Sequence, residues 1–414
     1  MFKSRQLSVN IGLIKNPALF LSLIWFLFLI LPPLVIHNLE HFPIVTYWLI
    51  NYSVGLNVQI LPIFFVLAAI FAFLTGWLCA QAIFPVKLMR FPVIHAYMIS
   101  RIHFFSLLII IPILVWIFFS AHSVGGLANL LTLPLEDRHY AGNILRANAF
   151  PGVRTLQAML VSVSLLNFAI LIAPDKAYMN KNLKIAKLVS FSLFAIGISI
   201  TILMPFYVSQ RILVLLALLA MLYLATFRIS GRTANYIIVS LTLAFFSLWI
   251  LTETVTFNIS ISESVRYGTE KALFYLVNNF QNNANAIAIL LNNYGLLYPG
   301  AFLAEAADTY KWELVNIELS RVRGGGTLGL FGGYFYYLGL FSIVIFLLLG
   351  FVLRYIFSRC AVNISSLLLF SLIFASLANS VQTVPLVGII IWANICFLMI
   401  CTTNLPQKLL RMKS

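Results

Sequence analysis

A glycine-rich segment that follows two arginines has the composition of an anion-binding turn. Arg321 and Arg323 stand directly before three consecutive glycines, after which an apolar stretch begins. A helix starting there would offer unpaired N–H groups and a positive dipole, and glycines let the backbone approach an anion closely. The GK[ST] signature of a P-loop does not follow. Gly325, Gly329 and Gly333 are four residues apart, a spacing that also suits close helix packing in membranes, so the segment serves packing, anion binding or both.

Four side chains are candidate acids or bases. Glu305 and Asp308 are one helical step apart and can face the same hydroxyl group. Glu253 lies near the end of an apolar stretch, where a carboxylate shielded from water becomes a stronger base. His139 is the best placed of the histidines. The structural alternative for each is an ion pair with a nearby arginine or an interfacial packing role. Because the sequence has no HExxH, DxD or Cys/His cluster, we expect no metal and no other cofactor.

The composition places these residues in a membrane protein. The chain of 414 residues is 62% hydrophobic and 9% charged, which excludes soluble enzymes, secreted disulfide scaffolds and disordered tails. Its four cysteines lie in apolar runs without CxxC spacing and indicate neither a disulfide framework nor a zinc site. We expect an all-α polytopic membrane protein in which residues 1–414 form one domain. About ten apolar runs are long enough to cross a bilayer, namely Pro17 to Ile36, Val58 to Phe84, Phe104 to Val124, Leu156 to Pro174, Leu188 to Tyr207, Ile212 to Phe227, Ala234 to Phe257, Thr327 to Phe351, Val362 to Ser380 and Pro385 to Thr403.

The distribution of charge predicts the orientation. With ten spans, 17 of the 26 lysines and arginines fall on the side of the N-terminus, whereas ten of the 11 acids fall on the other side. The positive-inside rule therefore predicts cytoplasmic N- and C-termini. The net charge of +15 is then a topological signal and an attraction to anionic lipid, and requires no nucleic acid. The alternative, one tilted helix over Leu188 to Phe227, would move every later loop to the opposite side.

Two predicted outer loops are large, residues 125–155 and 258–326. The second contains a helical pattern in which apolar residues recur at steps of three and four, and amides fill the positions between them. The pattern predicts an amphipathic helix on the outer membrane–water interface. Its apolar positions are Leu273, Leu276, Phe280, Ala284, Ile287 and Leu291, and its amides are Asn278, Asn279, Gln281, Asn282, Asn283 and Asn285.

Arginine is preferred over lysine on the predicted outer side. Seven arginines but only two lysines lie there, and a planar guanidinium suits a pyrophosphate or carboxylate ligand. Arg211 is the clearest candidate, because it begins a span next to Ser209 and Gln210, and Arg266 and Arg146 are further candidates. The alternative for each is an ion pair with an outer acid or snorkelling to lipid phosphates.

Several of these features together resemble the bacterial O-antigen polymerase (Wzy) family. They are the order of spans, the short turn ending in Ser209-Gln210-Arg211, the large late loop and the stretch Gly326 to Leu340. Tyr334 or Tyr336 with Gly339 is similar to the family's aromatic-to-glycine step after the late loop. The family arrangement of an arginine, ten residues and a glycine occurs as Arg321 to Gly332.

The resemblance implies a bundle like that of GT-C glycosyltransferases in a bacterial inner membrane. It implies inverting, metal-independent glycosyl transfer on the periplasmic face, which polymerises oligosaccharide repeat units linked to undecaprenyl pyrophosphate. The expected partners are the lipid-linked donor and acceptor glycans, membrane lipid and a chain-length-regulating co-polymerase. Arg211, and then Arg321 and Arg323, would hold the pyrophosphate. The alternatives are an O-antigen ligase or another lipid-linked glycosyltransferase, and a flippase or transporter, which would be expected to have charges at the bilayer midplane or broken helices.

Overall fold

The chain folds almost entirely into α-helices. The computed structural model describes residues 16–51, 60–85, 91–174, 178–179, 183–207, 211–229, 231–257, 259–295, 300, 329–380 and 389–403. Within these ranges six helices are long and apolar enough to cross a membrane, as the hydropathy of the sequence predicts. They are α1 (Pro17–His37), α3 (Ile60–Ile83), α4 (Ala96–Ser123), α7 (Val153–Ile172), α8 (Leu183–Leu203) and α15 (Phe341–Arg359).

Four further predicted spans correspond to helices with shorter apolar stretches, so the predicted total of ten is not established by length and composition. These helices are α9 (Arg211–Ala225), α10 (Gly231–Phe257), α16 (Ile364–Ala378) and α17 (Ile389–Thr402). The long helices carry apolar side chains on their outer surface. On α4, for example, Phe104, Ile111 and Phe118 are spaced by seven residues and are each more than half exposed. Such a stripe is stable against lipid and unfavourable against water.

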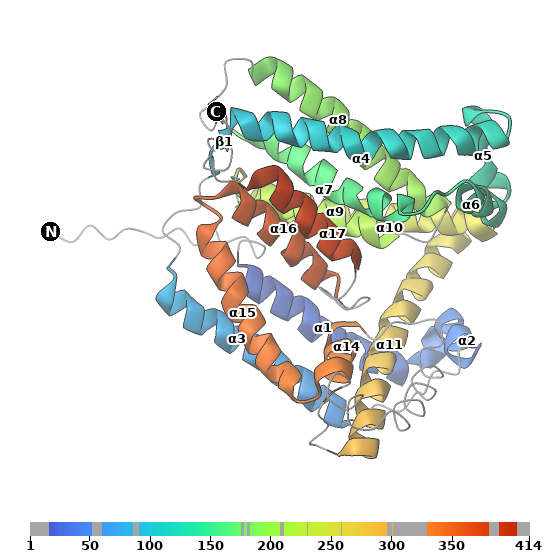
Figure 1. The fold of residues 1–414 in the computed structure, drawn as a ribbon. Helices are drawn as coiled ribbons and strands as arrows, with labels where there is room; N and C mark the ends of the chain where they lie inside the picture. The colour runs from blue at the N-terminus through green and yellow to red at the C-terminus, as the bar shows by residue number, and fades with distance from the viewer. Residues whose placement is uncertain are drawn as a thin grey trace.

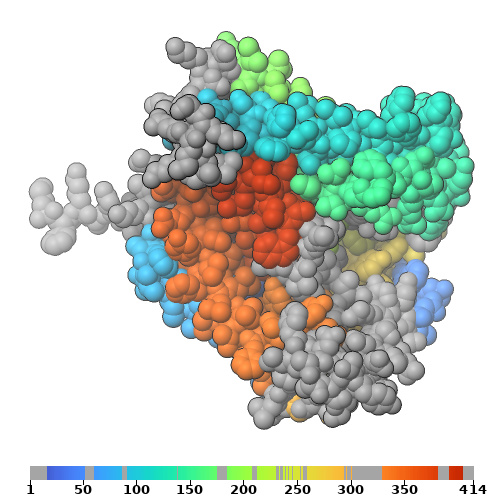
Figure 2. All heavy atoms as spheres, in the orientation of Figure 1, coloured from blue at the N-terminus to red at the C-terminus, as the bar shows by residue number. Residues whose placement is uncertain are grey.

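The short elements mark two opposite ends of the bundle (Figure 1). At one end, called the α5–α6 face, lie α5 (Leu127–Glu136), α6 (Arg138–Ala147), η2 (Leu39–His41) and α2 (Pro43–Asn51). At the other end, called the β1–β2 face, β1 (Ile94–His95) pairs in parallel with β2 (Tyr178–Met179). There the Arg101 guanidinium donates to the carbonyls of Ile400 and Thr403, which joins the start of α4 to the end of α17. In Figure 2 the side chains of α17 adjoin those of α4.

The segment from Leu188 to Phe227 forms two helices rather than one. The turn η4 (Met204–Phe206) separates α8 from α9, and the Tyr207 hydroxyl donates to the Leu130 carbonyl of α5 at 2.9 Å. Gly142 of α6 lies so close to the Tyr207 carbonyl that a Cβ atom would clash with it. At the far end of α9, the Tyr223 ring packs at a tilt against Phe370 of α16. The chain therefore reverses at η4, and the single-helix alternative is wrong.

The predicted span over Thr327 to Phe351 is wrong as a single helix, because the chain breaks near its middle. Helix α14 (Gly329–Leu338) ends before Gly339, which has a φ of +56°, and α15 begins at Phe341. A left-handed residue of this kind terminates a helix, and glycine adopts it without steric cost. The apolar composition is continuous across the break, so hydropathy alone does not reveal it.

Helices α3 and α15 pack closely because two glycines remove side chains from their contact. A Cβ atom on Gly76 would overlap the Leu347 carbonyl, and one on Gly350 would overlap the Phe73 carbonyl. Next to this contact the Trp25 ring of α1 packs edge-on against Phe73 of α3. Close backbone approach between small residues is a main source of helix association in lipid.

We expect Gly350→Ala to lower thermal stability and Gly268→Ala to preserve or raise it. The first methyl group meets the backbone of α3, and overpacking of this kind costs about 1–3 kcal/mol. The second has neighbours at 3.4–3.8 Å, and alanine is preferred over glycine inside a helix by about 0.5–1 kcal/mol. Thermal unfolding of both variants in the same detergent measures the difference, and equal melting temperatures would contradict the close contact.

Candidate functional site

Helix α11 (Ile261–Tyr294) carries most of the polar side chains that the sequence assigns to the late outer loop. Its first turn is held by a capping box: the Ser260 hydroxyl accepts from the Glu263 backbone N–H, and the Glu263 carboxylate accepts from the Ser260 backbone N–H. The carboxylate also accepts from the Ser260 hydroxyl at 2.7 Å. These hydrogen bonds favour the charged form and lower the pKa of Glu263. The start of α11 is thus fixed by its own sequence.

About two turns further along, Glu270 ties α11 to the short helix α2. One oxygen of its carboxylate accepts from the Ile44 backbone N–H at 2.7 Å, in the first turn of α2. The other oxygen accepts from the Arg266 guanidinium at 3.1 Å. A carboxylate at a helix N-terminus is stabilised by the unpaired N–H groups and the helix dipole. Arg266, a predicted substrate-binding residue, is therefore engaged by Glu270, although its side chain is 66% exposed.

A buried ion pair joins α10 to α11. Lys271 of α11 contacts the Glu253 carboxylate of α10 at 2.7 Å, and the Glu253 side chain has no exposed surface. The same ammonium lies 6.0 Å from the Trp48 ring of α2 and 5.5 Å from the Tyr267 ring. Glu253, a predicted catalytic base, is thus the partner of a lysine and holds the corner between the two helices. This is the structural alternative of an ion pair that the sequence left open for Glu253, with a lysine in place of an arginine.

The middle of α11 does not lie on a membrane surface with its amides exposed, as the amphipathic pattern predicted. Asn278, Asn279, Gln281, Asn282 and Asn283 are each at most 3% exposed, and the apolar positions between them are buried too. The apolar prediction holds in part, because Phe280 packs on Phe28 of α1. The amides are enclosed because α11 contacts α1, α2, α3 and α14 along its length. We name these five amides the α11 amide set.

The amide set connects α11 to the broken helix α14. The Asn283 side-chain oxygen accepts from the Gly332 backbone N–H at 2.6 Å. A Cβ atom on Gly332 would press against the Asn283 backbone and side chain, so a glycine is needed for this approach. Tyr334, a predicted binding residue two positions later, is buried and packs edge-on against Phe346. Gly332 therefore provides close packing in α14, where the predicted packing glycines Gly329 and Gly333 are also buried, whereas Gly325 lies outside the described residues.

Two members of the amide set retain unused hydrogen-bonding atoms. Within the part of the chain that the structure describes, both polar atoms of the Gln281 amide are buried without a partner, and so is the Asn278 amide nitrogen. An unpaired buried polar group costs about 1–3 kcal/mol, because it has lost its hydrogen bonds to water. Neighbouring Asn282 donates to the Asn278 amide oxygen at 3.2 Å, so one end of this pair is satisfied. Two donor groups, the amide nitrogens of Gln281 and Asn278, and one acceptor, the Gln281 amide oxygen, can thus bind a polar ligand.

Two other predicted residues lie on α6 of the α5–α6 face. His139 and Arg146 are exposed, and Arg146 donates weakly to Asn143 at 3.5 Å. Gly142 of α6 packs on the Tyr207 carbonyl, so α6 lies next to the turn η4, which precedes α9 in the chain. Arg211 is the first residue of α9, and its side chain lies outside the described residues, as do Glu305, Asp308, Arg321 and Arg323.

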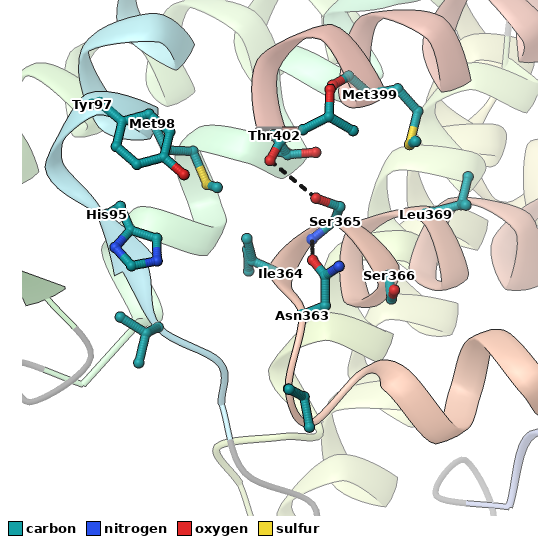
Figure 3. A pocket seen from close by; sticks show the side chains of 13 residues that line it. His95, Tyr97, Met98, Asn363, Ile364, Ser365, Ser366, Leu369, Met399 and Thr402 are labelled. Atoms are coloured by element: carbon teal, nitrogen blue, oxygen red, sulfur yellow. Dashed lines mark hydrogen bonds between the residues drawn. The ribbon is translucent and has the colours of Figure 1, made fainter. Parts of the chain in front are cut away.

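A cavity of about 510 Å³ lies on the β1–β2 face (Figure 3). His95, Tyr97 and Met98 line one side, and Ser365 at the start of α16 lines the other. The Ser365 hydroxyl donates to the Thr402 carbonyl at 3.1 Å, which closes the wall between α16 and α17. Of the predicted site residues whose side chains the structure describes, none lines this cavity.

Within the described part of the chain, no three His, Cys, Asp or Glu side chains gather as metal ligands. Comparison of the chain with models of protein families, with curated proteins and with solved structures finds no match. The functional argument therefore depends on the residues themselves.

We expect Glu253→Gln to destabilise the protein and the double variant Glu253→Gln/Lys271→Met to recover most of the loss. The single change leaves a lysine without its counter-charge in a buried position, a loss of about 3–5 kcal/mol. The double change removes both charges. Thermal unfolding of the two variants measures the recovery. If the double variant is no more stable than the single one, the ion pair does not hold the corner.

Acid should weaken the start of α11 through Glu263. Because its pKa is lowered in the folded protein, its contribution to stability is present above the ordinary value of 4.5 and is lost as the pH falls through the lowered value. Glu263→Gln should remove this part of the acid response. The melting temperatures of both proteins between pH 3 and 6 measure it, and parallel curves would contradict the capping role.

Proposed function

We propose that the protein polymerises oligosaccharide repeat units carried on undecaprenyl pyrophosphate, in a bacterial inner membrane with both termini in the cytoplasm. The observation that carries this proposal is the α11 amide set, buried beside the broken helix α14 in a bundle of apolar helices. An amide group both donates and accepts hydrogen bonds. It therefore suits a hydroxyl group, which also donates and accepts them. A polyhydroxylated substrate supplies the partner that the unpaired atoms of Gln281 and Asn278 lack.

The surrounding helices suit the other half of such a substrate. A glycan linked to a polyprenyl chain needs a polar site for its sugars and an apolar surface for its tail. Helices α1 and α3 contact α11 and expose large apolar side chains such as Phe26 and Phe71. Sugars would then bind at α11 and α14, with the tail against the lipid-facing helices.

The proposed reaction is an inverting displacement. A hydroxyl oxygen of the acceptor sugar attacks the anomeric carbon of the donor glycan, the bond from that carbon to the phosphate oxygen breaks, and undecaprenyl pyrophosphate leaves. The acceptor proton goes to a base, for which His139, Glu305 and Asp308 are the proposed candidates. The leaving diphosphate is stabilised by guanidinium groups, which we assign to Arg211, Arg321 and Arg323. No metal is required for these steps.

The ion pair between Glu253 and Lys271 has a positioning role in this proposal. It fixes the corner from which α11 extends, as Glu270 fixes α2 against the same helix. Arg266 and Arg146 lie toward the α5–α6 face and would contact phosphate only if the substrate reaches that face. A chain-length-regulating co-polymerase is the proposed protein partner.

Transport of a lipid-linked glycan is a second candidate function. Two observations favour it: the break between α14 and α15, and the buried Arg354 in α15. Discontinuous helices and buried charges are common in transporters. An O-antigen ligase differs from a polymerase only by its acceptor, and no described residue favours one acceptor over the other.

We expect Gln281→Met to abolish long glycan chains without lowering protein stability, and Asn283→Leu to lower stability. Methionine has a similar volume and removes two unpaired polar atoms, whereas Asn283→Leu removes the acceptor for the Gly332 N–H. The measurement is the surface-glycan profile of a deletion strain complemented with each variant, together with the melting temperature of each purified protein.

The deletion strain itself separates the candidate functions. A single repeat unit on the lipid A core indicates a polymerase, whereas no repeat unit indicates a ligase or a flippase. If Gln281→Met supports chains of normal length, the amide set is not the sugar site and the proposal loses its main support.

A further inference from the structure

Arg354 is a buried charge for which the described residues provide no counter-charge. Its side chain is 7% exposed, and its Nε atom is buried without a hydrogen-bond partner. Within the described part of the chain it forms no ion pair and no hydrogen bond. Arg359, five residues later on the same helix, is exposed and stacks on the Tyr355 ring. Arg359 therefore behaves as an arginine that snorkels to an interface, and Arg354 does not.

Aromatic rings surround the Arg354 guanidinium. It lies 5.4 Å from the Trp77 ring of α3 and 5.4 Å from the Phe357 ring. Cation–π attraction offsets only a part of the cost of removing a charge from water. The rings thus hold the guanidinium in place without neutralising it.

A second unpaired polar group lies in the same environment. The Tyr223 side chain of α9 is fully buried, and within the described residues its hydroxyl has no hydrogen-bond partner. Two rings lie between Tyr223 and Arg354: Tyr223 packs on Phe370, Phe370 packs on Phe357, and the Phe357 ring lies 5.4 Å from the guanidinium. A guanidinium and a phenol are both hydrogen-bond donors, and together they match the oxygens of one anion.

The place in the fold indicates which anion can reach this site. Arg354 precedes Cys360 by six residues, or about 9 Å along the helix. The Cys360 thiol contacts the Ser366 carbonyl at the start of α16, next to the cavity of the β1–β2 face. The site is therefore near the boundary between lipid headgroups and hydrocarbon. Basic pockets between membrane helices at this depth bind the phosphates of anionic lipids.

We propose that Arg354 and Tyr223 form a binding site for a phosphate group on the β1–β2 side of the bundle, separate from the proposed glycan site. The phosphate belongs to an anionic phospholipid whose headgroup enters between the helices, or to free phosphate. The bound anion supplies the missing counter-charge and joins α9 to α15.

The test uses the full-length protein in detergent and measures its melting temperature and its lipid adducts by native mass spectrometry. The probes are phosphatidylglycerol, dioleoylglycerol as its phosphate-free counterpart, and inorganic phosphate. We expect phosphatidylglycerol to raise the melting temperature by about 3 °C or more, and dioleoylglycerol to have no such effect. Arg354→Met should weaken phosphatidylglycerol binding about tenfold, and Tyr223→Phe should weaken it less.

Arg359→Met is the matched control, because it removes an exposed arginine from the same helix and should leave binding unchanged. An Arg354-dependent response to phosphatidylglycerol alone identifies a lipid headgroup, and one to inorganic phosphate as well identifies a free anion site. The proposal is overturned if neither probe gives an Arg354-dependent response, or if Arg359→Met reduces binding equally. If Arg354→Met does not fold, unchanged phosphatidylglycerol binding in Tyr223→Phe overturns it.

Discussion

Polar groups inside an apolar helix bundle must find partners within the protein or its ligands, and this constraint determines the role of α11. In its first half each charge is satisfied: Glu263 by the helix N-terminus, Glu270 by Arg266 and the start of α2, and Lys271 by Glu253 of α10. Removing the charges of such a pair from water costs free energy. Removing only one partner lowers the folding stability further, because it leaves the other charge buried and unpaired. The first half of α11 is therefore fixed to α2 and α10 by interactions that act as a unit.

The second half of α11 satisfies its polar groups differently, and this difference positions the candidate site. Asn283 hydrogen bonds to the backbone of α14, where the absence of a side chain at Gly332 allows the two helices to touch. Through this contact a helix of ten residues is held inside the bundle, although it is too short to cross a membrane. Among the described residues the Gln281 amide has no equivalent partner. The first half of α11 thus fixes the position of the second half, where the proposed glycan site lies.

The sequence predicted the helices better than it predicted their surroundings. Apolar runs identify the long helices because a bilayer requires about 20 apolar residues per crossing, and this requirement is local. The break at Gly339 is not predicted from hydropathy, because the apolar composition does not change there. For α11, the alternation of amides and apolar residues gave the helix correctly, but it says only that two faces differ, not what covers each face. The Glu253–Lys271 pair joins residues 18 positions apart across a helix corner, a contact that no periodic pattern encodes.

The contrast between paired and unpaired polar groups is the basis of both proposed binding sites. If polarity in the interior served only to orient the helices, Gln281 would have a partner as Asn283 has, because an apolar residue of similar volume would be more stable there. The same reasoning distinguishes Lys271, which has its carboxylate, from Arg354, which has only aromatic rings. Burying an unpaired polar group lowers folding stability. A ligand that hydrogen bonds to the group would offset this loss. Sugar hydroxyls at α11 and a phosphate at α15 are the ligands whose chemistry matches these two sets of unused atoms.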